Sequence, residues 1–163
     1  ALLHYYFRTK DKLFEGIFKQ IFRRFIPKIQ ETLNSEELDL FGKIEFFCES
    51  YTNLLMKNPM IPMFILREIN KNPERLAKII KNVGIVPEIF ISQVADEVKA
   101  SRIISISPYQ LIVNLISLSV FPIAARPLLE RVLFSGDSKL YDKFLEERKK
   151  ENAEFIINAI KSK

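Results

Sequence analysis

Apolar residues recur at steps of three and four through most of this chain, which is the period of a helix that buries one face. The first such stretch covers residues 9–33, and a polar break over residues 34–37 separates it from a second stretch that ends before Pro59. Cys48 lies on the apolar side of the second stretch. We therefore expect Cys48 to be a small buried side chain rather than a nucleophile, since no histidine is near it in the sequence.

The middle of the chain predicts further helices. Residues 60–66 are apolar on nearly every side, so we expect a short helix that its neighbours enclose, interrupted at its end by Arg67 and Glu68. Asn72 and Pro73 then supply a cap and a first-turn proline for the next helix.

Glycine and proline mark the later boundaries. Gly84 and Pro87 break or kink the helical pattern before the period resumes. Ser107, followed by Pro108 and Gln110, is typical of a capping box with proline at the first helical position. A new helix is predicted to begin there.

The last part of the chain predicts two helices. Pro122 and Pro127 bend or divide the first of them, and Asp137 with Ser138 starts the second. The apolar face expected on that last helix is formed by Leu140, Phe144, Leu145, Arg148, Asn152, Phe155, Ile156 and Ala159. No stretch has the alternation of a strand, so the sequence predicts an all-α fold.

Composition fits one compact domain with a charged end. The chain has 163 residues, of which 48% are hydrophobic and 28% charged, and it holds only four glycines. Residues 1–33 carry seven basic and three acidic side chains, whereas the remainder carries 18 basic and 17 acidic ones. A basic end joined to a balanced body favours a protein that presents that end to a polyanion, and a solvated helix face that happens to be basic is the alternative.

Residues 2–14 suggest the end of one helix, a turn and the start of another. Thr9 is placed to cap the second helix, and Asp11 lies in its first turn, where a negative charge suits the helix dipole. The polar side chains just before and within this turn donate hydrogen bonds of the kind that phosphate oxygens accept. The alternative is an ordinary helix corner whose aromatic side chains pack against the core.

The same block resembles the junction between the recognition helix and the fourth helix of TetR-family transcriptional regulators, where Leu-Tyr-Tyr-His-Phe-Lys-(Ser/Thr)-Lys-(Glu/Asp)-x-Leu is typical. The residues that fall in register are Leu3, His4, Tyr5, Tyr6, Phe7, Arg8, Thr9, Lys10, Asp11, Leu13 and Phe14. Histidine stands first in the aromatic trio here and third in the family pattern. The resemblance implies that the chain begins inside the motif, so that part of the recognition helix lies upstream of Ala1.

This resemblance implies a TetR-like helical domain for ligand binding and dimerisation over residues 34–163. A remnant of a helix-turn-helix domain over residues 1–8 and a connecting helix over residues 9–33 would precede it. The residues expected to contact DNA are His4, Tyr5, Tyr6, Thr9 and Lys10. In the family the last two helices pair with those of a second subunit, and the residues expected at that interface are Leu118, Phe121, Phe144, Leu145 and Phe155.

A cavity for a small hydrophobic ligand is also expected among the middle helices, with a few polar groups that fix orientation. The residues expected to line it are Phe47, Tyr51, Met60, Met63, Phe64, Phe90, Asn114 and Ser117. For any single one of these residues a purely structural place in the core is the preferred interpretation, and the cavity is predicted for the set. Asn114, an amide within an apolar helix, would bond either a ligand or a partner helix, and we favour the partner helix slightly.

The chain offers little for catalysis. It has one histidine, one cysteine and no glycine-rich loop, so we expect no enzyme, no cofactor and no metal ion. The uncharged stretch of residues 109–125 is too short for a membrane span, and we expect a cytoplasmic protein without a membrane partner. The function expected is a homodimeric repressor that leaves its operator DNA when a small hydrophobic ligand binds. A helical carrier or protein-interaction module without DNA binding is the alternative.

Overall fold

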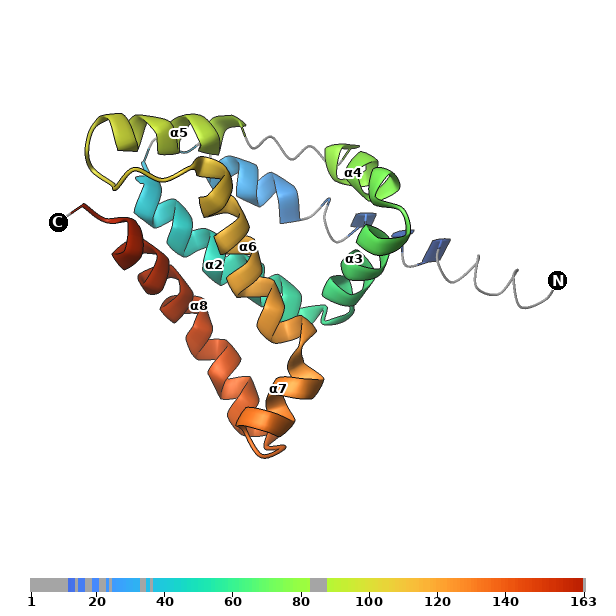
Figure 1. The fold of residues 1–163 in the computed structure, drawn as a ribbon. Coiled ribbons are helices and arrows are strands. Elements are labelled where there is room, and N and C mark those ends of the chain that lie inside the picture. Colours follow the sequence, from blue (N-terminus) through green and yellow to red (C-terminus); the bar gives the residue numbers. More distant parts are fainter. Residues whose placement is uncertain are drawn as a thin grey trace.

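The fold is a set of packed helices, shown in Figure 1 in a computed structural model that describes residues 12–13, 15–16, 19–20, 23, 25–32, 35, 37–82 and 88–162. The named helices are α2 (Leu40–Lys57), α3 (Met60–Lys71), α4 (Pro73–Asn82), α5 (Glu88–Lys99), α6 (Pro108–Ala124), α7 (Arg126–Leu133) and α8 (Ser138–Ile160). Residues 12–13, 15–16, 19–20, 23 and 25–32 are helical as well, and we call them the N-terminal helical segment. Within the described residues no sheet is present, which confirms the all-α prediction there.

Helices α2, α6 and α8 pack against one another and form the centre of the fold. Helix α2 supplies a buried face at steps of three and four residues that includes Ile44, Cys48 and Leu55, each with 0% of its surface exposed. The expectation that Cys48 is a buried small side chain is thereby confirmed. In Figure 1, α3 and α4 form the right-hand corner of the fold, α5 lies across its top, and α7 joins α6 to α8 at the bottom.

The corner of α3 and α4 corrects part of the sequence prediction. Helix α3 does not stop near Leu66 but continues to Lys71, and its outer side is not enclosed, since Met60 and Met63 are 60% and 51% exposed. The apolar sequence was a poor guide because only one side of α3 packs against the fold. The cap predicted at the next helix is confirmed: the Arg75 backbone amide donates to Asn72 Oδ1 at 3.0 Å.

The start of α6 is where the sequence predicts it, although Ser107 caps it differently. Ser107 is the N-cap residue and Pro108 opens the helix, but the Ser107 side chain makes no capping hydrogen bond. The capping box is therefore wrong in this detail, while the boundary is confirmed. The break predicted at Gly84 and Pro87 lies outside the described residues.

Two prolines divide the apolar run after Pro108. Pro122 lies inside α6, which ends at Ala124, and Pro127 lies in the first turn of α7, whose axis is bent by 73° from that of α6. Among the described helices no single one is long and apolar enough to cross a membrane, and α6 and α7 meet that length and composition only when taken together across the bend.

The last helix begins where expected but turns a different side inward. The Asp137 carboxylate accepts hydrogen bonds from the backbone amides of Lys139 at 2.9 Å and Leu140 at 3.0 Å. The buried side chains of α8 are those of Tyr141, Leu145, Asn152, Ala153, Ile156 and Ile160. The face predicted from the sequence is wrong for Leu140 and Phe155, which are 49% and 67% exposed, and for Ala159, which is also exposed. The sequence has two overlapping apolar stripes there, and only one of them faces α2.

The end of α8 is tied to the loop between α5 and α6. The Ile104 amide donates to the Ile160 carbonyl oxygen at 2.8 Å, and Ile103 and Lys161 form an isolated antiparallel bridge. These backbone bonds close the upper left of the fold in Figure 1.

Candidate functional site

A proline creates the main polar contact between α6 and α8. Because Pro122 has no N–H, the Leu118 carbonyl one turn earlier lacks its usual helical donor. Two side chains of α8 supply donors instead: Asn152 Nδ2 lies 3.1 Å from that oxygen and Arg148 Nη2 lies 3.2 Å from it. This arrangement fixes the position of α6 along α8.

The corner between α6 and α7 is held by an aromatic cluster. The Tyr141 hydroxyl donates to the Pro122 carbonyl oxygen at 2.6 Å, and burial raises the pKa of this phenol. The Tyr141 ring centroid lies 5.0 Å from that of Phe134 and 5.5 Å from that of Phe144. The Arg126 guanidinium lies 5.2 Å from the Tyr141 ring centroid, so a cation also packs on the cluster.

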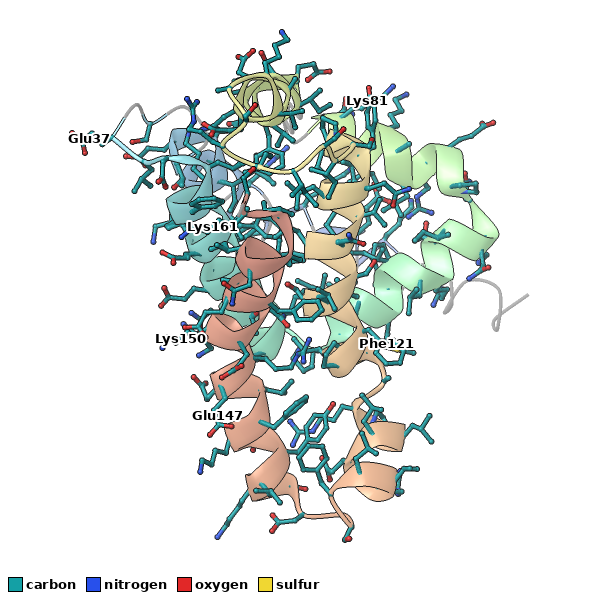
Figure 2. All side chains as sticks on the ribbon, turned by 60° about the vertical axis from the view of Figure 1, so that its left-hand side comes forward. Glu37, Lys81, Phe121, Glu147, Lys150 and Lys161 are labelled. Carbon is teal, nitrogen blue, oxygen red and sulfur yellow. The ribbon has the colours of Figure 1, made fainter. Side chains whose placement is uncertain are left out.

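Helices α6 and α8 leave a partly apolar surface uncovered, which we call the α6–α8 outer face. It is formed by Asn114, Ser117, Leu118 and Phe121 of α6 and by Phe144, Glu151 and Phe155 of α8. Phe121 and Phe155 are 61% and 67% exposed, whereas Leu118 and Phe144 are partly buried. The α6 residues follow steps of three and four and the α8 residues follow steps of seven and four, so the members of each set share one side of their helix. Figure 2 shows the two helices side by side, with Phe121 labelled on α6 and Glu147 and Lys150 on α8.

Four of the five residues predicted at a subunit interface lie on this outer face. The exception is Leu145, which is only 3% exposed and packs in the same core cluster as Leu55 and Tyr141. The sequence placed Leu145 with Phe144 because neighbours on one helix both look apolar. In the fold Leu145 points inward, whereas Phe144 lies at the edge of the core.

The residues predicted to line a ligand cavity are not brought together as one set. Tyr51 and Phe64 belong to one buried cluster, Phe90 belongs to another, and Phe47 packs against both. The other four are exposed: Met60 and Met63 lie on the outer side of α3, and Asn114 and Ser117 lie on the α6–α8 outer face. In this chain Asn114 therefore points to the surface that a partner helix could cover.

Several polar side chains are buried beneath the outer face. Thr52 of α2, Ser119 of α6 and Asn152 of α8 are each 2–3% exposed. Ser119 donates its hydroxyl to the Leu115 carbonyl oxygen at 2.9 Å. Thr52 Oγ1 and Arg148 Nε have no hydrogen-bond partner among the described residues. The sequence contained one sign of these buried polar groups, the pair Arg148 and Asn152, which are four residues apart within an apolar stripe.

The buried carboxylate of Glu68 and its partner Arg75 connect the N-terminal helical segment to α3 and α4. The sequence analysis did not predict this connection. Glu68 of α3 is 1% exposed, and its Oε2 lies 3.7 Å from Arg75 Nε of α4. Arg75 Nη2 also lies 2.5 Å from Glu15 Oε2, and Lys19 Nζ lies 2.6 Å from Glu15 Oε1. The hydrogen bond from Lys19 and the charge of Arg75 lower the pKa of Glu15.

The residues expected to contact DNA, His4, Tyr5, Tyr6, Thr9 and Lys10, lie outside the described residues. Over the described part of the chain, no group of three or more histidine, cysteine, aspartate or glutamate side chains could hold a metal ion. Comparisons with protein-family models, curated proteins and solved structures found no match.

Proposed function

We propose that the chain is the sensing and dimerisation part of a ligand-responsive transcriptional regulator of TetR type. In this proposal it acts as a homodimeric repressor that a small hydrophobic ligand releases from operator DNA. The support from the sequence is the block of residues 2–14 and the excess of basic residues over residues 1–33. The support from the fold is the α6–α8 outer face.

The observation that carries the proposal is the exposure of two phenylalanines on adjacent helices. Phe121 and Phe155 are 61% and 67% exposed, and Val113 adds a further exposed apolar side chain at 57%. Several large apolar side chains exposed on one face are typical of interaction surfaces, which supports the proposal. A two-fold interface uses the same patch on both subunits. A second copy packed on this face would therefore cover these side chains on both chains at once.

The proposed mechanism couples ligand binding to the distance between two DNA-binding ends. Recognition helices of a dimer enter successive major grooves about 34 Å apart. A ligand that binds more tightly to a body with another spacing shifts the population off the operator. Arg75 provides a physical link, because it contacts Glu68 of the body and Glu15 of the N-terminal helical segment.

Sedimentation equilibrium at micromolar concentration tests the dimer. We expect the mass of two chains for the unchanged protein and of one chain for the double variant Phe121→Ser, Phe155→Ser. Because both side chains are exposed, the double variant should retain its helical content. Met63→Ser, an exposed change on α3, is the matched control and should leave the dimer intact. A single-chain mass for the unchanged protein would contradict the proposal.

The alternative function is a helical carrier or interaction module that does not bind DNA. The gene sequence upstream of Ala1 separates the two possibilities. About 40 residues with a helix-turn-helix pattern would support the regulator. A start codon directly before Ala1 would contradict it.

A further inference from the structure

Arg148 carries a half-buried charge that no acidic side chain among the described residues balances. Among the described residues no carboxylate forms an ion pair with it, and only Nη2 has a hydrogen-bond acceptor, the Leu118 carbonyl oxygen. Burial lowers the pKa of the Arg148 guanidinium. A partly desolvated cation without a counter-charge is costly, so a partner that accepts hydrogen bonds and carries negative charge would be favoured here.

Thr52 lies in the same part of the interior, and its hydroxyl also lacks a partner within the described part of the chain. Leu55 of α2 packs in one buried cluster with Leu145 of α8, and Cys48 of α2 packs in another with Ala153 of α8. Thr52 lies between Cys48 and Leu55, and Arg148 lies between Leu145 and Ala153, so both belong to the same stretch of the α2–α8 contact. Thr52 follows Cys48 by one helical turn on the buried side of α2 and is 2% exposed. Its Oγ1 has no hydrogen-bond partner among the described residues.

The Arg148 guanidinium and the Thr52 hydroxyl both favour an anion whose oxygen atoms accept hydrogen bonds. Arg148 Nε is a donor only, and the Thr52 hydroxyl has a hydrogen to donate. A carboxylate suits such a pair because it accepts hydrogen bonds at two oxygens and carries the missing charge. The surroundings are apolar: the Phe144 ring centroid lies 5.4 Å from the Arg148 guanidinium carbon. Leu118, Phe144 and Arg148 are only partly buried, so this part of the interior borders the α6–α8 outer face.

We propose that Arg148 and Thr52 bind the carboxylate of an amphipathic organic acid whose apolar part lies along Phe144 and Leu118 between α6 and α8. The inference rests on the proposed ligand-responsive function and names the class of ligand. A bound acid would sit at the edge of the proposed dimer face, where its binding and subunit packing influence each other. Binding of the acid is nonetheless measured separately from dimerisation, so the two proposals fail separately.

Titration calorimetry with octanoate tests the site, with octan-1-ol and octylamine as probes of equal chain length. We expect saturable octanoate binding that is at least tenfold tighter than binding of the alcohol or the amine. Arg148→Met should weaken octanoate binding by at least tenfold. Arg131→Met is the matched control, because Arg131 is an exposed arginine of α7 that donates to the Pro127 carbonyl oxygen, and it should bind octanoate as the unchanged protein does.

Thr52→Val separates binding from stability and decides the test if Arg148→Met does not fold. The Thr52 hydroxyl has no partner among the residues that the structure describes, so replacing it with a methyl group should leave the unliganded protein as stable or more stable, yet weaken octanoate binding several-fold. Equal binding of octanoate and octan-1-ol would overturn the proposal. So would octanoate binding that Thr52→Val leaves unchanged. A third outcome would also overturn the proposal: the unchanged protein binds no octanoate, and Arg148→Met no longer dimerises. In that case the counter-charge of Arg148 would come from a second copy of the chain.

Discussion

The Tyr141 hydroxyl lies 2.6 Å from the Pro122 carbonyl oxygen and donates a hydrogen bond to it. Together with the bonds from Arg148 and Asn152 to the Leu118 carbonyl oxygen, this contact joins α8 to the part of α6 that contains the proline. The proline interrupts the helical bonding of α6, and α8 supplies the replacement donors. The orientation of the two helices that form the outer face therefore depends on a few side chains of α8.

Tyr141→Phe should lower the free energy of unfolding by about 1–2 kcal/mol, because it leaves a buried carbonyl without its donor. Urea unfolding followed by circular dichroism measures the change. Tyr109→Phe is the matched control, since Tyr109 is 67% exposed, and it should change stability by less than about 0.5 kcal/mol. Equal stability of the two variants would show that the hydrogen bond of Tyr141 contributes nothing net.

Arg75→Met should destabilise the protein by about 2–3 kcal/mol, because it leaves the buried Glu68 carboxylate without its cation. Glu15→Gln, which removes only the more exposed contact of Arg75, should cost less than about 1 kcal/mol. Adding Glu68→Gln to Arg75→Met should restore part of the loss, since the amide carries no charge. A double-mutant cycle from urea unfolding gives the coupling energy, and an absence of coupling would rule out the ion pair.

Alkaline pH should destabilise the fold through buried groups that prefer to stay protonated. Burial raises the pKa of Cys48 from 9.0 to about 11 and that of Tyr51 from 10.0 to about 12. Above pH 9 the unfolded chain therefore binds fewer protons than the folded chain, so the free energy of unfolding falls as pH rises and levels off above the folded pKa values. Urea unfolding between pH 8 and pH 12 measures the slope, and the variant Cys48→Ala, Tyr51→Phe should make it shallower.

Under the proposed regulator function, Lys10→Ala in the full-length protein should weaken DNA binding nearly equally on all sequences. We expect this because the resemblance places Lys10 at the phosphate backbone, where contacts carry little sequence information. The slope of log affinity against log salt should become shallower by about one unit. Fluorescence anisotropy at several salt concentrations measures both quantities. A changed preference at a single base would instead make Lys10 a base contact.

Features that depend on neighbouring residues in the sequence were predictable. The caps at Asn72 and Asp137 work through side chains that bond amides two or three residues away, so their signals are local. The buried stripe of α2, including Cys48, was also predictable, because a single clear apolar face leaves one choice of orientation.

Features that depend on distant segments were not predictable. The inward side of α8 is set by α2, which lies about a hundred residues earlier, so the sequence misplaced Leu140 and Phe155. Glu68 looked like a surface acid because its partner Arg75 belongs to the next helix. The unpartnered Thr52 was not foreseen for the same reason, since a threonine in a helix gives no sign of which helix will cover it.

The backbone bonds between Ile104 and Ile160 and the bridge from Ile103 to Lys161 have a practical consequence. They hold the last described residues beside the loop that joins α5 to α6. A fluorophore attached after Lys161 would therefore respond to rearrangements of that loop. To follow the corner of α3 and α4, a reporter would have to be placed there directly, for example at the exposed Met63.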